Sequence, residues 1–188
     1  MINFVHIPKN AGTSFRKMIE GELLRDVKYI NHDRSGQNLS GDNMYVLRDP
    51  FDRFSSAFQY ITQYYVAHKI NVANIVSPNE LAEKLGDGCK IAWDAISDNH
   101  TIDNVPCNYN WVFVPQWNWF YDPRHILFYD TLNSDFSKFL SSIGHYPIEL
   151  EECNKSNKIE VEYSEKAKDF IQNFYKEDFD IIREFRIK

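Results

Sequence analysis

One stretch near the start of the chain sets the expected architecture: His6-Ile7-Pro8-Lys9-Asn10-Ala11-Gly12-Thr13-Ser14. It follows a short apolar run and precedes apolar residues at helical spacing, so the pattern predicts a strand, a loop and a helix. A glycine lets backbone amides approach an anion closely, the Thr13 and Ser14 hydroxyls can donate at the helix start, and Lys9 supplies positive charge. The stretch is therefore equipped to hold a phosphate, although its lysine precedes the glycine, unlike that of a Walker A loop.

Further along the chain, short apolar runs alternate with helical patterns. We expect strands near residues 27–30, 44–47 and 125–129, and helices from Phe15, Pro50 and Ser77, over residues 131–143 and again near the end of the sequence. Such alternation predicts a parallel sheet whose ligands bind at the carboxyl ends of the strands. The expected fold is α/β, with one three-layer domain over residues 1–188 in which helices flank a short central parallel sheet.

The composition limits the class of function. The chain has 188 residues, 43% of them hydrophobic and 15% aromatic, which is ample for a packed core. Its formal net charge of −6 argues against a nucleic-acid or membrane-surface binder. The 3 cysteines form no CxxC pair, which favours free thiols in a reducing compartment. With no signal-peptide pattern and no apolar run of membrane-spanning length, we expect a cytoplasmic protein.

A second group of anion-binding side chains follows the expected strand at residues 44–47. Its sequence is Arg48-Asp49-Pro50-Phe51-Asp52-Arg53-Phe54-Ser55-Ser56. Pro50 suits the first turn of a helix, and Arg53 and Ser56 then share one helix face. Arg48, Arg53 and Ser56 can therefore hold a second anion, although Arg53 can equally brace the loop against a carboxylate.

Together these two loops resemble the carbohydrate-type sulfotransferases that use 3′-phosphoadenosine 5′-phosphosulfate (PAPS). Residues 6–14 resemble that family's 5′-phosphosulfate loop, and residues 47–56 resemble its 3′-phosphate motif. Weaker matches are Val114-Pro115-Gln116, Leu127-Phe128-Tyr129-Asp130-Thr131-Leu132 and Tyr175-Lys176-Glu177-Asp178-Phe179. The resemblance spans the whole chain and implies a sulfotransferase domain with a fold like that of the P-loop NTPases.

The resemblance also implies roles for single residues. Lys9 contacts the oxygen that bridges phosphate and sulfate, and the 5′-phosphate is held by Asn10, Ala11, Gly12, Thr13 and Ser14. Arg48 and Ser56 hold the 3′-phosphate. No metal is expected. The sulfate acceptor is a hydroxyl of a small molecule or glycan, with a carbohydrate as the expected acceptor, and neither a nucleic acid nor a membrane is an expected partner. Because members of the family use a histidine or carboxylate base, we interpret His32 as the base, with Asp33 as the alternative.

Plainer interpretations stay open beside these. Residues 9–14 can form an ordinary helix N-cap, Arg48 can form a surface ion pair, and His32 can simply be solvated. His6 is expected to pack or to form a hydrogen bond. Trp111, Trp117 and Trp119 either form a wall that stacks on a sugar or belong to the core. Lys155, Ser156 and Lys158 either close over the nucleotide or form a solvated loop. Two other functions are a nucleotide-dependent kinase that needs ATP and Mg²⁺, and a catalytically silent nucleotide-binding or interaction domain.

Overall fold

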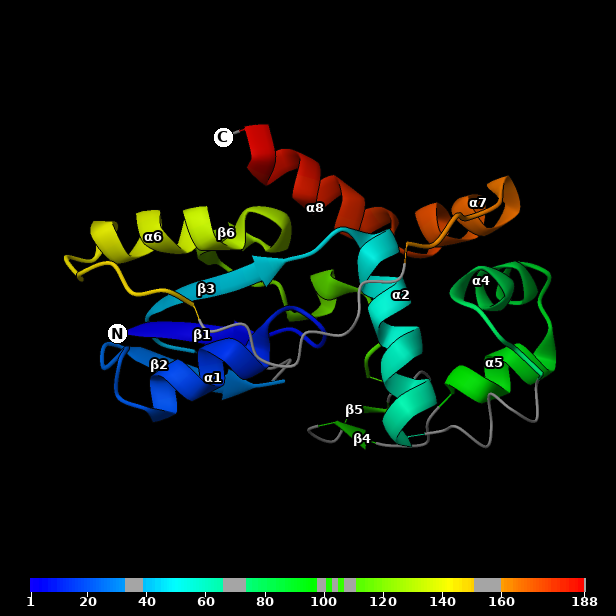
Figure 1. The fold of residues 1–188 in the computed structure, drawn as a ribbon, viewed down its shortest axis with the longest axis horizontal. Helices are drawn as coiled ribbons and strands as arrows, with labels where there is room; N and C mark the ends of the chain where they lie inside the picture. Colours follow the sequence, from blue (N-terminus) through cyan, green and yellow to red (C-terminus); the bar gives the residue numbers. More distant parts are fainter. Residues whose placement is uncertain are drawn as a thin grey trace. The chain divides into compact units, whose positions relative to one another are not determined.

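The computed structural model describes residues 1–32, 39–65, 74–97, 101–102, 105–106, 111–150 and 160–187. Within them the protein is an α/β domain with a four-stranded, all-parallel sheet and seven α-helices (Figure 1). The chain forms two compact units: unit 1 comprises Met1–Arg48 and Gln116–Lys155, and unit 2 comprises Asp49–Pro115 and Ser156–Lys188. The predicted α/β class and parallel sheet are confirmed, whereas one domain over residues 1–188 stays a prediction.

Unit 1 contains the parallel sheet. Its strands are β1 (Ile2–His6), β2 (Val27–Asn31), β3 (Asp42–Leu47) and β6 (Pro123–Phe128), hydrogen-bonded in the order β2-β1-β3-β6. All of the strands predicted from the sequence are present. β2 lies on one side of β1 and β3 on the other, so the chain reverses its direction across the sheet between β1 and β3. Ligands of open parallel sheets bind at the carboxyl ends of the strands at such a switch point.

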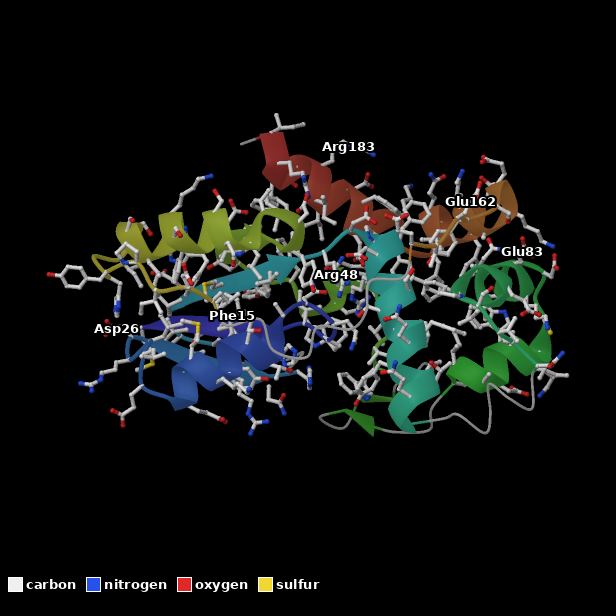
Figure 2. The ribbon with its side chains drawn as sticks, viewed as in Figure 1. Phe15, Asp26, Arg48, Glu83, Glu162 and Arg183 are labelled. Carbon is white, nitrogen blue, oxygen red and sulfur yellow. The ribbon has the colours of Figure 1, made fainter. Side chains whose placement is uncertain are left out.

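One face of the sheet packs against α1 (Gly12–Glu20) and α6 (Leu132–Ser142). The ring of Phe15 on α1 stacks on Phe4 of β1 with 4.3 Å between centroids, and it meets the edge of Phe136 on α6 at 5.4 Å. Phe15 is labelled in Figure 2. The core that these elements share comprises Ile2, Phe4, Phe15, Met18, Leu24, Val27, Met44, Val46, Leu127, Leu132, Phe136, Phe139, Leu140 and Leu150. Both helices therefore use the apolar stripes read from the sequence.

The opposite face of the sheet meets the segment that runs from the 3₁₀-helix η3 (Gln116–Trp119) into β6. Neighbouring strand residues point to opposite faces, so Tyr45 lies on this side. Its hydroxyl donates to the carbonyl of Tyr121 at 2.8 Å, and its ring lies 4.9 Å from that of Phe120. Trp119 is buried, whereas Trp117 is 45% exposed. The core interpretation of the aromatic run over residues 111–121 holds for Phe113 and Trp119, whereas Trp117 and Tyr121 are exposed.

The end of α1 differs from the prediction. Phe15, Met18, Ile19 and Leu23 recur at helical spacing in the sequence, which predicts a helix that reaches Leu23. The helix instead ends at Glu20, with Gly21 as its C-cap. Leu23 is 51% exposed, and the next residue, Leu24, enters the core instead. The amide of Gly21 donates to the carbonyl of Lys17 at 2.8 Å, which closes the last turn and lets the chain leave the helical register.

Unit 2 is mainly helical. Its elements are α2 (Pro50–Tyr60), a π-helical turn η2 (Ile61–Tyr65), α4 (Pro78–Gly86), α5 (Lys90–Ile96), a small hairpin of β4 (Thr101–Ile102) and β5 (Val105–Pro106), α7 (Glu165–Phe174) and α8 (Lys176–Ile187). The predicted N-cap Ser77 accepts from the amide of Glu80 at 3.1 Å, and Asp49 caps α2 in the same way through the amide of Phe51 at 2.9 Å. The described helices include none with the length and apolarity to cross a membrane.

Arg53 organises the inside of unit 2. It is 1% exposed, and its Nη2 donates to the carbonyl of Val114 at 2.8 Å. The hydroxyl of Tyr175 donates to the neighbouring carbonyl of Phe113 at 2.8 Å. Burial raises the pKa of Tyr175, while the nearby Arg53 opposes that rise. Arg53, Val114 and Tyr175 come from three different stretches that carry the family resemblance, and they lie together in unit 2. The buried guanidinium of Arg53 therefore braces this part of the fold.

Candidate functional site

The loop between β1 and α1 has an unusual backbone. Lys9 and Ala11 both adopt left-handed conformations, with φ of 68° and 59°. Such angles are uncommon for residues other than glycine and concentrate at functional sites. Gly12 does not adopt one; a Cβ at this position would overlap the imidazole ring of His6. Position 12 therefore needs a glycine for close packing against the His6 ring, a requirement that the sequence did not reveal.

The start of α1 presents backbone amides to this loop. Ala11 is the N-cap residue, no side chain caps the first turn, and that turn contains no acidic residue. The first amides of any helix lack acceptors within the helix, and they lie at the positive end of its dipole. The amides of Ser14 and Phe15 already donate to the carbonyl of Ala11, at 3.0 and 3.3 Å. The amides of Gly12 and Thr13 are therefore placed to bind an anion. No side chain caps this end of the helix, unlike in an ordinary N-cap.

Buried polar side chains tie the loop to the carboxyl end of β3. Arg48, the residue after β3, donates from Nη1 to the carbonyl of Lys9 at 2.7 Å. Asn10 donates from Nδ2 to the carbonyl of Val46 at 2.7 Å and to Oε1 of Gln116 at 2.6 Å. Gln116 also pairs with the backbone of Arg48, accepting from its amide at 3.0 Å and donating to its carbonyl at 2.9 Å. The loop and the end of β3 therefore form one braced unit.

The guanidinium of Arg48 is held on a second side by an aromatic ring. Its Cζ lies 4.1 Å from the ring centroid of Tyr129, the first residue after β6. This distance is well within the range of cation–π attraction. Arg48 is labelled in Figure 2 at the end of β3. Arg48 and Lys9 thus bring two positive charges to the switch point of the sheet.

His32 follows the carboxyl end of β2 and is tied to β1. Its Nδ1 lies 3.1 Å from the carbonyl oxygen of His6. A carbonyl can only accept, so Nδ1 carries the proton and Nε2 keeps its lone pair. Burial lowers the pKa of His32 to about 4. A neutral imidazole with a lone pair on Nε2 is the form in which histidine takes up a proton.

His6 packs directly against His32. The two ring centroids are 4.1 Å apart, and Nδ1 of His6 lies 2.5 Å from the hydroxyl of Tyr29 on β2. Burial, together with the neighbouring His32, lowers the pKa of His6 to about 3. His6 therefore packs and forms a hydrogen bond, as expected from the sequence.

The structure brings together most of the predicted site. Lys9, Asn10, Ala11, Gly12, Thr13, Ser14 and Arg48 gather at the ends of β1 and β3, and His32 follows the adjacent strand β2. Ser56 lies on α2 in unit 2, so its pairing with Arg48 stays a prediction. Asp33, the alternative base, and the predicted nucleotide-covering residues Lys155, Ser156 and Lys158 lie outside the described residues.

Two residues of this site had no role in the sequence analysis. Gln116 belonged to a weak motif, and Tyr129 belonged to an expected strand. In the sequence, Tyr129 stands at the end of an expected strand, and Gln116 follows Pro115 within the aromatic run over residues 111–121. Neither signal identifies its partner, because Gln116 meets Arg48 across 68 residues of sequence.

Unit 2 contains a hollow of about 640 Å³ whose lining includes Phe51, Tyr163 and Lys168, and none of the predicted site residues lines it. No group of three or more histidine, cysteine, aspartate or glutamate side chains in the described part of the chain could hold a metal ion.

No protein-family model, curated protein or solved structure matches this chain. Its function therefore has to be inferred from the site itself.

Proposed function

We propose that this protein is a sulfotransferase that moves the sulfuryl group of PAPS to a hydroxyl of a small molecule or glycan. One observation carries the proposal: the Lys9 loop, the start of α1 and Arg48 lie together at the switch point between β1 and β3. Two anion-binding elements on neighbouring strand ends suit a nucleotide with phosphates on both sides of its ribose. The same proposal assigns the sheet to a three-layer fold of the P-loop NTPase-like sulfotransferase type.

The donor set fits such a nucleotide in charge and geometry. The amides at the start of α1 and the hydroxyls of Thr13 and Ser14 suit the 5′-phosphate, with Lys9 beside them. Arg48 suits the 3′-phosphate, because a guanidinium can bind two phosphate oxygens at once. The carbonyl of Lys9 and the ring of Tyr129 orient this guanidinium before any ligand arrives. We also assign Ser56 to the 3′-phosphate, on the family resemblance alone.

When bound, PAPS supplies a sulfuryl group that bonds to the acceptor oxygen as the bond between sulfur and the 5′-phosphate oxygen breaks. In this proposal Lys9 and the first amides of α1 stabilise the negative charge that develops on the leaving phosphate. Nε2 of His32 takes the acceptor's proton, because Nδ1 is committed to the carbonyl of His6. The negative charge of the nucleotide raises the pKa of His32 from its low value, which makes it a better base.

Calorimetric titration with the product nucleotide, 3′-phosphoadenosine 5′-phosphate (PAP), tests the proposal against AMP and ATP. We expect PAP to bind about 10- to 100-fold more tightly than AMP, which is the worth of charge-assisted hydrogen bonds to one phosphate. Lys9→Met and Arg48→Lys should both weaken PAP binding. Lys17→Met is the matched control, because Lys17 is an exposed cation in the last turn of α1.

Each alternative gives a different titration. Equal affinities for PAP and AMP would refute the assignment of Arg48 to a 3′-phosphate. A preference for ATP that depends on Mg²⁺ would favour the kinase. PAP binding that is not accompanied by sulfate transfer from PAPS to any of a panel of hydroxyl compounds would favour the silent domain.

A further inference from the structure

The imidazole of His6 lies between the start of the phosphate loop's helix and His32. On one side, its ring occupies the space where a Cβ of residue 12 would stand. On the other side, its centroid is 4.1 Å from that of His32. We propose that His6 is a positioning residue, a wedge through which the start of α1 sets the orientation of the His32 ring.

His6 is itself held firmly enough to act as a wedge. Its Nδ1 is hydrogen-bonded to the Tyr29 hydroxyl at 2.5 Å, and its ring stacks at 6.4 Å on that of Phe4, which is fully buried. Its backbone belongs to β1, which pairs with strands on both sides. The same residue contacts His32 twice, through its ring and through the carbonyl that accepts from Nδ1 of His32. A shift of His6 therefore moves both supports of the His32 ring.

The charges around His6 favour a neutral wedge over a proton carrier. Lys9 in the loop and Arg16 on α1 both oppose a positive charge on its ring, as does His32. Asn31, on β2, favours the charged form, and the Tyr29 hydroxyl also faces the ring. Burial is the largest effect, so His6 stays neutral over the pH range in which His32 would work.

The effect of His6 on catalysis rests on the proposed function, whereas its effect on the orientation of His32 does not. The amides that would hold the leaving phosphate begin at Gly12, and the proposed base is His32, so His6 links the two halves of the reaction. Displacing a reacting group by about 1 Å can lower a rate by about 100-fold. A donor that orders the start of α1 would therefore also order the base, without touching it.

The test follows the His32 imidazole by nitrogen-15 chemical shifts in the intact protein, which report which ring nitrogen carries the proton. We expect the Nδ1–H form in the wild type, and a shift toward the Nε2–H form, which solvated histidine favours, in His6→Ala and in Gly12→Ala. His125→Ala is the control, because it removes a half-buried imidazole packed on Phe139 of α6 and should leave His32 unchanged. A merely structural role of His6 predicts lower stability without a change of tautomer.

Combining the two substitutions tests the wedge itself. The methyl group of Gly12→Ala overlaps the His6 ring, so Gly12→Ala should be strongly destabilised alone but tolerated in the His6→Ala background. If Gly12→Ala does not fold, the His6→Ala spectrum decides alone. Retention of the Nδ1–H form and of the wild-type titration of His32 in folded His6→Ala would overturn the inference.

PAP separates this inference from the proposed function. With PAP bound, the wild type should keep His32 in the Nδ1–H form, and in His6→Ala PAP should still bind while His32 stays shifted toward the Nε2–H form. A wild type that binds no PAP would defeat the proposed function, whereas the tautomer result is obtained without any nucleotide. Return of His32 to the Nδ1–H form when PAP binds to His6→Ala would overturn the wedge and leave the PAP site standing.

Discussion

Lowering the pH from 7 to 5 should destabilise this protein through two histidines. Burial lowers the pKa of His6 to about 3 and that of His32 to about 4 from the usual 6.5. In the unfolded chain both side chains regain the usual value and bind protons below it. As the pH falls through 6.5, the unfolded state therefore gains protons that the folded state does not take up, and the free energy of unfolding decreases.

The size of the effect follows from the two shifts. Between pH 7 and pH 5, each histidine that ionises only in the unfolded state lowers the free energy of unfolding by about 2 kcal/mol, which makes about 4 kcal/mol for the pair. Both rings are only partly buried, and solvent screening reduces the effect, so we expect a loss of about 2–4 kcal/mol. Glu80 and Glu83, whose pKa values are lowered by hydrogen bonds, contribute stability that is lost mainly below pH 4.5. The window from pH 7 to 5 therefore reports chiefly on histidines.

Urea denaturation at pH 7, 6 and 5 measures the loss. The double variant His6→Asn/His32→Asn replaces both imidazoles by amides that do not titrate, so its stability should vary little over this range. His125→Asn serves as the control, because the burial that lowers the pKa of His125 is weaker; it should keep most of the wild-type decrease. A wild type equally stable at pH 7 and pH 5, or a double variant with the full decrease, would refute the reasoning.

Three further outcomes test individual contacts. Tyr129→Leu should weaken PAP binding about 3- to 10-fold by calorimetry, whereas Tyr129→Phe should preserve it, because Tyr129 contacts the guanidinium of Arg48 through its ring face and not its hydroxyl. Arg53→Met should lower the free energy of urea unfolding by about 2–4 kcal/mol, because the buried carbonyl of Val114 loses a charged donor. Ser77→Ala should cost about 1 kcal/mol in the same assay, by removing the N-cap of α4. Unchanged values in any of the three would show that the contact concerned has no such role.

The strands and most helices could be predicted because their signals are local. Strands that are buried on both faces appear as short continuous apolar runs, as at Phe4-Val5 and Val46-Leu47. The limits of α4 were equally clear, because Ser77 supplies the cap and Pro78 the first turn. α5 had no such signal: it is seven residues long, and its N-cap, Cys89, forms no side-chain capping bond. Its helicity comes from packing in unit 2, which local sequence does not encode.

The charged residues of the site's loops could be predicted from the sequence. The contacts that hold those loops could not, because they join residues far apart in the sequence. The anion-binding character of residues 9–14 and of Arg48 follows from residue types alone. The brace through Gln116 depends on pairing across the sheet, and the need for Gly12 depends on where the His6 ring lies. From the sequence we expected His6 only to pack or to form a hydrogen bond, because its contact with His32 appears only once β1 and β2 are paired.

The braces and the strained loop are best understood together. Left-handed backbone at Lys9 and Ala11 costs about 1–2 kcal/mol for each residue, so about 2–4 kcal/mol in all. The Arg48 bond to the Lys9 carbonyl and the two bonds from the Asn10 amide contribute about 1.5–3 and about 1 kcal/mol each. The two sums are of similar size, so the contacts from β3 and Gln116 are enough to hold a conformation that the loop would not adopt alone. An anion that enters this loop then finds its donors already in place, and the binding energy is not spent on ordering them.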